Sequence, residues 1–330
     1  MTKVFSGVQP TSDVPHLGNY IGAFRNWVTL QDRYQSLYCI VDLHSMTVAW
    51  DPTILARRTL QSAASLIALG IDPERSVLFV QSDVREHTEL AWILNCIARM
   101  GELNRMTQFK DKARNQEASV GAGLFAYPVL MAADVLVHRA HLVPVGDDQK
   151  QHLELMRDIA ERFNRSFGET FPIPDPLIPD VGGRVMSLDD PTKKMDKSSD
   201  RPGSLIWMTD PPEVVRSKIA KAVTDSGREI VYGPEKPALS NLLDIFSAVS
   251  GREVSDIQES FVGKGYADLK AELSDALIEF LSPFQERYSE LMKDTAELGK
   301  LLDRGADSAR QEAAETMKIV RERVGLRASS

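Results

Sequence analysis

Two short segments, about 180 residues apart, carry the side chains best suited to phosphate chemistry. The first, Pro15-His16-Leu17-Gly18-Asn19, opens a predicted helix directly after a predicted strand and turn. A helix start presents free backbone N–H groups and a positive dipole end, which favour phosphate. His16 and Asn19 can donate further hydrogen bonds to phosphate oxygens, and Gly18 lets a flat ring approach the backbone. This segment therefore predicts a nucleotide site.

The second segment, Lys193-Lys194-Met195-Asp196-Lys197-Ser198-Ser199, places three lysines within seven residues on a predicted loop. Lysine ammonium groups stabilise the charge that develops on leaving phosphate groups. Taken alone, each segment also fits a plainer interpretation: the first as a histidine-capped helix start, the second as a solvated basic loop. The pair, in this order and at this separation, favours a site that handles a nucleoside triphosphate.

Short β-type runs alternate with helical patterns in the first half of the chain, which predicts an α/β fold with a parallel, Rossmann-like sheet. The predicted strands are 4–6, 37–41, 77–81 and 142–145, and the predicted helices between and after them are 17–28, 51–70, 86–100 and 148–163. Residues 171–183 hold four prolines and two glycines and predict a loop-rich connection.

Beyond Asp210-Pro211-Pro212 the pattern predicts a mostly helical domain. The predicted helices are 213–223, 239–250, 253–262, 267–281, 283–303 and 307–324. Gly251 and Gly305 lie where helix stops are expected.

The bulk composition fits a protein of about two domains. The chain has 330 residues, 43% of them hydrophobic, and no apolar run approaches the ~20 residues that span a membrane. Its N-terminus lacks the apolar core of a signal peptide. Cys39 and Cys96 lie among apolar residues, so we expect two buried thiols and a reducing, cytoplasmic location.

The net charge of −8 argues against a polyanionic partner when the chain is taken as a whole. A nucleic acid responds to the local surface, however, and two segments are basic. Arg99–Arg114 has five basic residues against two acidic ones, and a second cluster holds Lys318, Arg321, Arg323 and Arg327. Solvated helix faces are the alternative interpretation of both.

Three other kinds of site find little support. The sequence has no P-loop motif, and Gly121–Ala126, which fits a loose dinucleotide pattern, does not follow a predicted strand. His138, His141 and His152 lack the spacing of zinc ligands. We therefore expect no metal site built by the protein, and any Mg²⁺ should arrive with a nucleotide.

Several segments closely resemble the bacterial tryptophanyl-tRNA synthetases, a family of class I aminoacyl-tRNA synthetases. The likeness covers nearly the whole chain. The segments that carry it are 5–23 (FSGVQPTSDVPHLGNYIGA), 146–152 (GDDQKQH), 190–198 (DPTKKMDKS), 222–226 (AVTDS) and 263–266 (GKGY).

The resemblance implies ATP as a substrate and assigns its contacts. The implied ATP-binding residues are Gln9, Pro10, Thr11, Gly18, Asn19, Gly146, Asp147, Asp148, Val185, Lys194, Met195, Asp196, Lys197 and Ser198. The implied catalytic residues are His16, Asn19, Lys112, Lys194 and Lys197.

For the amino acid, the resemblance implies that Asp134 accepts the indole N–H of tryptophan. Because the indole nitrogen is only a donor, its partner must be an acceptor, and a buried acceptor left unpaired penalises phenylalanine and tyrosine. A cap or ion pair is the alternative for Asp134. The further implied pocket residues are Phe5, Gly7, His44, Met131 and Gln149.

Two residues depart from the usual class I signatures. Asn19 stands in place of the second histidine of the first signature, as is ordinary for the tryptophan enzymes. Asp196 stands in place of the first serine of the Lys-Met-Ser-Lys-Ser signature. Its carboxylate would either repel ATP phosphates or pair with Lys194 or Lys197 and restrain the loop.

The resemblance implies a tryptophan–tRNA ligase that forms tryptophanyl-adenylate and charges tRNA(Trp). It implies a homodimer, and neither DNA nor a membrane as a partner. We expect a catalytic domain at 1–188, a mobile signature loop at 189–204, and a helical anticodon-binding domain at 205–330 whose last helices pack back on the catalytic domain. The alternatives are a paralogue that binds nucleotide or RNA without charging tRNA, and an enzyme that adenylates tyrosine or another small molecule.

Overall fold

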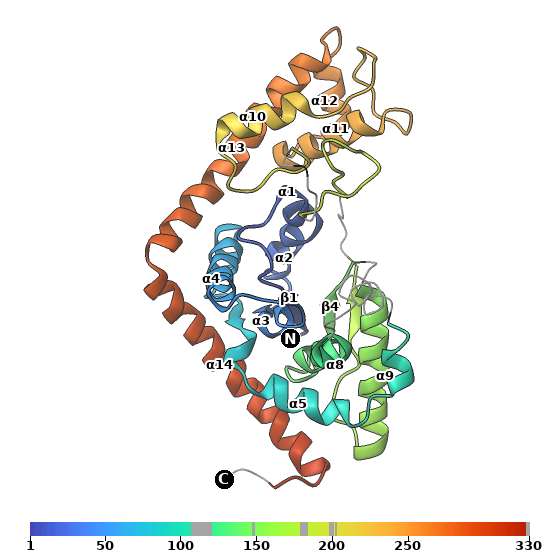
Figure 1. The fold of residues 1–330 in the computed structure, drawn as a ribbon, viewed down its shortest axis with the longest axis vertical. Helices are drawn as coiled ribbons and strands as arrows, with labels where there is room; N and C mark the ends of the chain where they lie inside the picture. The colour runs from blue at the N-terminus through green and yellow to red at the C-terminus, as the bar shows by residue number, and fades with distance from the viewer. Residues whose placement is uncertain (107–120, 147–148, 179–183, 198–200, 202, 328–330) are drawn as a thin grey trace.

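A parallel β-sheet lies at the centre of the molecule (Figure 1). The computed structural model describes residues 1–106, 121–146, 149–178, 184–197, 201 and 203–327. Within them the sheet has five parallel strands in the order β3-β2-β1-β4-β5. The strands are β1 Lys3–Val8, β2 Gln35–Ile40, β3 Val77–Val80, β4 Leu142–Pro144 and β5 Asp175–Leu177. The predicted α/β class is therefore confirmed.

The strand order creates a switch point between β1 and β4. From β1 the chain builds outward through β2 to β3, and it then returns to place β4 on the other side of β1. In open α/β sheets, ligands bind beyond the carboxyl ends of the strands at such a point. The segments that follow β1 and β4, which begin at Gln9 and Val145, therefore lie where this fold binds ligands.

Helices cover both faces of the sheet and form the second half of the chain. Those of the first half are α1 Leu17–Asn19, the π-helix η1 Tyr20–Phe24, α2 Arg25–Leu30, α3 Asp42–Ser45, α4 Pro52–Ala68, the 3₁₀ helix η2 Gln81–Asp83, α5 Glu86–Asn95, α6 Met100–Leu103, α8 Ala122–Leu136 and α9 Lys150–Phe167. Those of the second half are α10 Pro212–Lys221, α11 Pro237–Ser250, α12 Val254–Ser260, α13 Tyr266–Lys293 and α14 Thr295–Arg323.

Three apolar clusters hold these elements together. One lies between the sheet and α5, α8 and α9, and a second lies on the opposite face with α2 and α4. The third joins α1 and η1 to α10, α11, α12 and α13. Helix α14 contributes to both sheet clusters, and Figure 1 shows α13 and α14 running along one side of the molecule from the helical end to the sheet.

Two predicted breaks in the last helices were wrong. Pro283 lies inside α13, and Gly305 lies inside α14 rather than ending a helix. The break falls at Asp294, whose side chain accepts a hydrogen bond from the backbone N–H of Glu297 and so caps α14. Gly305 is explained by packing, because a Cβ there would lie 1.9 Å from the carbonyl oxygen of Leu78 in β3.

Other differences also have physical causes. β5 lies in the segment predicted as a loop, and an edge strand tolerates its Pro176. Helix α8 was not predicted because it is apolar on nearly all sides and shows no helical periodicity. Helix α5 ends at Asn95, since Arg99 takes an extended conformation and starts α6. Cys39 is buried as expected, but Cys96 is exposed.

None of the helices among the described residues is both long and apolar enough to cross a bilayer.

We expect Gly305→Ala to destabilise the protein by about 2 kcal/mol or more, because the added methyl group forces α14 away from β3. Gly299→Ala is the matched control in the same helix, where nothing lies within 4 Å of the added Cβ. That control should gain up to about 1 kcal/mol from helix propensity. Urea unfolding of both variants measures the difference, and equal stabilities would contradict the packing explanation.

Candidate functional site

The strand-to-helix corner between β1 and α1, which carries Pro15 and His16, is fixed by a distant segment. That segment follows the loop that carries Lys193, Lys194 and Lys197, called the lysine loop below. The backbone N–H of Leu17 donates to the carbonyl of Ile206 at 2.8 Å, and that of Met208 donates to the carbonyl of Pro15 at 3.0 Å. His16 forms an isolated antiparallel bridge with Trp207. The backbone N–H of His16 also donates to Asn19 Oδ1 at 3.1 Å, which ties the two predicted site residues together. The corner is therefore held by residues about 190 positions away.

The lysine loop is anchored by backbone hydrogen bonds on the side facing the helical domain. The N–H of Met195 donates to the carbonyl of Val185 at 3.0 Å, and that of Ser187 donates to the carbonyl of Lys193 at 2.8 Å. Asn241 of α11 then bonds both sides of Met186, accepting from its N–H at 2.8 Å and donating to its carbonyl at 3.0 Å. The loop position is thereby set by a helix of the second half of the chain.

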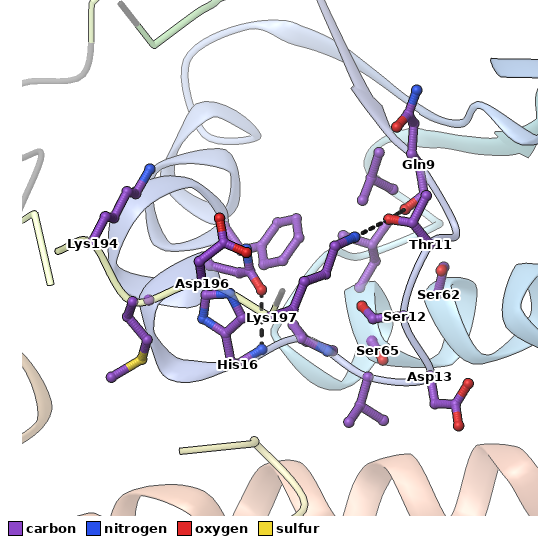
Figure 2. A pocket seen from close by; sticks show the side chains of 18 residues that line it. Gln9, Thr11, Ser12, Asp13, His16, Ser62, Ser65, Lys194, Asp196 and Lys197 are labelled. Carbon is purple, nitrogen blue, oxygen red and sulfur yellow. Dashed lines mark hydrogen bonds between the residues drawn. The ribbon is translucent and has the colours of Figure 1, made fainter. Parts of the chain in front are cut away.

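Corner and loop enclose one cavity of about 200 Å³ (Figure 2). It is small because Lys197 reaches across it and donates to the hydroxyl of Thr11. The predicted nucleotide residues that line it are Gln9, Thr11, His16, Gly18, Asn19, Lys194, Met195, Asp196 and Lys197. Helix α4 closes another side with Ser62, Ser65 and Leu66, which sequence reasoning did not identify.

His16 is electrically neutral near pH 7. Burial lowers its pKa to about 4; the carboxylate of Asp196 opposes this shift, and the charges of Lys197 and Lys194 add to it. Its Nδ1 is buried and has no hydrogen-bond partner among the described residues. A buried ring nitrogen without a partner, on a side chain that lines a cavity, fits a site for a polar ligand. Gly18 packs closely beside it, because a Cβ there would lie 3.0 Å from His16 Nδ1.

A second cluster surrounds the buried carboxylate of Asp134 on α8. His44 Nε2 lies 2.7 Å from Oδ2, while Gln81 Nε2 at 2.6 Å and His87 Nδ1 at 2.7 Å share Oδ1. Burial raises the pKa of Asp134, but the hydrogen bonds and charges of His44 and then His87 outweigh it and lower the pKa to about 2. The carboxylate is therefore an anionic acceptor inside the protein.

The other residues predicted for the tryptophan pocket come from β1, α8 and the start of α9. Phe5 is buried in β1 and stacks on His138, with ring centroids 5.9 Å apart. Gly7 leaves little room for a side chain, since a Cβ there would lie 3.2 Å from Val41 Cγ1. Met131 is partly buried on α8, and Gln149 precedes α9. β1 joins the two groups of residues, because it supplies Phe5 and Gly7 here and leads into Gln9 of the cavity.

Some predicted residues contribute differently or lie outside the described residues. Pro10 is buried and does not line the cavity, and Val185 is buried and accepts the hydrogen bond from the N–H of Met195. Gly146 follows β4 and is exposed. The predicted residues outside the described ranges are Lys112, Asp147, Asp148 and Ser198.

Sequence reasoning missed the residues that support the acid. Gln81 and His87 bond Asp134 directly. Tyr127 packs edge-on against His44, with ring centroids 6.3 Å apart, and its hydroxyl lies 2.7 Å from His152 Nε2. Burial raises the pKa of Tyr127 to about 12, so its hydroxyl stays protonated. No local motif marks these residues, since only the folded sheet brings them together.

The second basic cluster has a structural role in part. Arg321 of α14 pairs with Glu89 of α5, with Nε 2.6 Å from Oε1. Arg323 donates to the carbonyl of Phe167 at 3.2 Å, at the end of α9. Of the first cluster, Arg99 and Arg105 are exposed, and the remaining basic residues lie outside the described ranges.

Among the described residues, no group of three or more His, Cys, Asp or Glu side chains is arranged to hold a metal ion.

Fold and cavity together define a nucleotide-binding protein with a Rossmann-like sheet. The sequence pattern of the family described as tRNA synthetases class I (W and Y) matches residues 1–282. The tryptophan–tRNA ligase of Wolinella succinogenes is 50% identical over 324 residues, covering 98% of both chains. That of Mycobacterium leprae is 52% identical over 330 residues, covering 98% of this chain and 96% of the relative.

Solved structures agree with these sequence relatives. Tryptophanyl-tRNA synthetase from Mycoplasma pneumoniae superposes with a TM-score of 0.88 at 35% identity, covering 99% of this chain and 98% of that one. The Campylobacter jejuni enzyme complexed with ADP and tryptophan gives 0.86 at 35% identity, covering 98% and 100%. The chain therefore belongs to the class I tRNA synthetases of the tryptophan and tyrosine group.

We expect His16 to titrate near pH 4 in the folded protein, against about 6.5 for an ordinary histidine. The folded state then binds fewer protons than the unfolded state between these values, so stability is complete above pH 6.5 and falls toward pH 4. Ring NMR signals of His16 measure the midpoint directly. Between pH 6.5 and pH 4, the free energy of unfolding measured in urea should fall by about 3 kcal/mol less in His16→Asn than in the wild type. A midpoint at pH 6 or above would contradict the burial argument.

Proposed function

We propose that the protein is a tryptophan–tRNA ligase. The carboxylate of tryptophan attacks the α-phosphate of ATP, which gives tryptophanyl-adenylate and releases pyrophosphate. The acyl group then passes to a terminal ribose hydroxyl of tRNA(Trp) with release of AMP. The observation that carries this proposal is the meeting of the His16 corner and the Lys197 loop around one cavity, connected by β1 to the buried anion Asp134. The names of the relatives support the same reaction.

The cavity residues would bind ATP and act by placing it and by stabilising phosphate charge. His16, which is neutral and has an unpartnered ring nitrogen, and Asn19 would contact phosphate oxygens. Lys194 and Lys197, together with Lys112, would neutralise pyrophosphate as it leaves. Because Lys197 spans the cavity to Thr11, its side chain would have to move to admit a nucleotide. The Campylobacter jejuni enzyme, solved in complex with ADP and tryptophan, supports an adenine nucleotide as a substrate.

The remaining predicted nucleotide contacts complete this proposal. We assign ATP contacts also to Gln9, Pro10, Thr11, Gly18, Gly146, Asp147, Asp148, Val185, Met195, Asp196 and Ser198. Mg²⁺ would enter with ATP as part of the substrate, held by phosphate oxygens.

Asp134 would accept the indole N–H of tryptophan. Its carboxylate has about four acceptor positions, and three protein donors already use two on Oδ1 and one on Oδ2. The remaining position lies on Oδ2, beside His44. Phe5, Gly7, Met131 and Gln149 would complete the pocket together with His44.

The chain would comprise two domains and a connecting loop with different roles. Residues 1–188 would form the catalytic domain, 189–204 the signature loop, and 205–330 the helical domain that binds the anticodon. Helix α14 packs on the sheet, so the last helix would belong physically to the catalytic domain. The exposed Arg99 and Arg105 mark the candidate contact with the acceptor stem, and the reaction would take place in the cytoplasm.

We expect ATP–pyrophosphate exchange that depends on tryptophan among the twenty amino acids. Asp134→Ala should lower kcat/KM for tryptophan about 100-fold or more, because the indole N–H loses a buried charged acceptor. Its preference over phenylalanine and tyrosine should fall as well. Exchange driven best by tyrosine would establish the alternative of a tyrosine enzyme, and no exchange with any amino acid would contradict adenylate formation.

Asp196→Ser in the same assay addresses the alternative of a paralogue that does not charge tRNA. In a working enzyme the change should alter exchange by no more than a few-fold, because serine is the residue usual at this position of the signature. A gain of orders of magnitude would show that this acid disables the site.

We propose a homodimer through the face around Trp92. The indole of Trp92 is 72% exposed and borders an apolar groove of about 310 Å³ between α3, α5 and α8. Met46, also exposed, and Leu130 line the same groove. An exposed indole on an apolar groove is typical of a protein–protein contact, and the family resemblance makes a second copy the expected partner.

Trp92→Glu should therefore convert the protein to a monomer at micromolar concentration, because it places a charge in an apolar interface. Val262→Glu is the matched control, since Val262 is 80% exposed on the helical domain, away from this face. Analytical ultracentrifugation measures the mass of each. A dimeric Trp92→Glu variant would exclude this face as the interface.

A further inference from the structure

A chain of buried histidines runs away from the predicted amino acid pocket. His87 bonds Asp134 through Nδ1 and approaches His138 Nε2 with its own Nε2 at 3.0 Å. Both histidines are fully or almost fully buried, on α5 and just after α8. The spacing of His138 does not fit a zinc ligand, and the pocket residues predicted from the sequence do not include it.

The acceptor at one end fixes the roles of the ring nitrogens. Asp134 is ionised, because its pKa lies at about 2, so it can only accept. His87 Nδ1 must therefore carry a proton and donate it to Oδ1. The Nε2 of His87 is then the atom that His138 holds, and this contact prevents the ring from turning away from the carboxylate.

Packing alone does not explain His138. Its ring lies against Phe5, at 5.9 Å, and Phe79, at 5.4 Å between centroids. Its Nδ1 is buried and lacks a hydrogen-bond partner among the described residues; Glu312 Oε2 lies 4.0 Å away. Burial, and then the charge of His87, keep the pKa of His138 well below its usual value, so the ring is neutral. An apolar ring would fill the same space without leaving a buried nitrogen unpaired. The hydrogen bond to His87 is therefore the contribution that a histidine makes at this position.

The arrangement decides how much of the carboxylate stays available. With His87 and Gln81 on Oδ1 and His44 on Oδ2, one acceptor position remains, and it points to the His44 side. If His87 released Oδ1, the carboxylate would have two open positions and a freer orientation. The match to a single N–H donor would then weaken.

We propose that His87 and His138 are positioning residues that set the preference for an indole N–H, with His138 holding His87 against Asp134. This inference rests on the proposed tryptophan activation, because it assigns the support of that same pocket. Neither histidine contacts the substrate in this account. Both act through the orientation of one carboxylate.

The test compares tryptophan with its isostere in which a benzothiophene sulfur replaces the indole N–H. In pyrophosphate exchange, His138→Leu should raise KM for tryptophan about tenfold with little change in kcat, as expected for one weakened hydrogen bond to a charged group. KM for the isostere should not change, so the preference for tryptophan falls by the same factor. His138→Gln should restore most of the preference, because its side-chain amide can occupy the position of Nε2.

Several outcomes overturn the proposal. Equal losses for both substrates, or equal behaviour of the Leu and Gln variants, would show a merely structural role. If the wild type gives no exchange with any amino acid, the proposed function fails. ¹⁵N NMR of the histidine rings then tests the hydrogen bonding of His87 independently of activity. A protonated Nδ1 on His87 supports the proposed hydrogen bond from His87 to Asp134, and an unprotonated Nδ1 overturns it. The same NMR measurement on the wild type decides the question if the core variants do not fold.

Discussion

An ionised carboxylate inside a protein must be solvated by protein groups, and this constraint organises the sheet edge around Asp134. Moving a charge out of water costs many kcal/mol unless hydrogen bonds replace the water. Here α3 supplies His44, the turn after β3 supplies Gln81, and α5 supplies His87. The other end of the Gln81 amide accepts the N–H of Leu43 at 3.1 Å, which fixes its orientation. One buried anion therefore fixes the positions of these three elements relative to one another.

A second dependence links the two parts of the chain. The cavity is lined by residues from the turn after β1 and by residues from a loop about 180 positions later. Backbone bonds from Leu17 to Ile206 and from Met208 to Pro15 join the corner to the helical part. Asn241 then fixes the loop at Met186. The cavity that we propose binds ATP is therefore joined by hydrogen bonds to the helical part of the chain.

Much of the fold was predictable from local patterns. β1, β2, β3 and β4 were all found, and the start of α4 was found because Asp51 and Pro52 form a cap signal. The errors arise where tertiary packing overrides local preference. β5 is formed by pairing with β4, Gly305 is inside a helix because β3 lies against it, and α8 is buried on too many sides to show a period.

The candidate site was also predictable only in part from the sequence. Residues on the two signatures could be named because their types and order are recognisable, and the structure places His16 and Lys197 in one cavity, while their roles remain predictions. His87, Gln81 and Asn241 carry no local signal. Their importance arises from hydrogen bonds across long sequence separations, which a single sequence does not reveal.

Helix α14 has a consequence for synthesis on the ribosome. The sheet is encoded first, yet Ala309, Ala313 and Val320 of α14 are wholly buried in one of its clusters, and Leu302 lies in the other. A nascent chain that has produced all five strands still exposes the apolar surface that these residues cover. The core around the sheet therefore cannot be completed during translation until α14 has been synthesised, and a chaperone that bound the chain before then would meet this uncovered face.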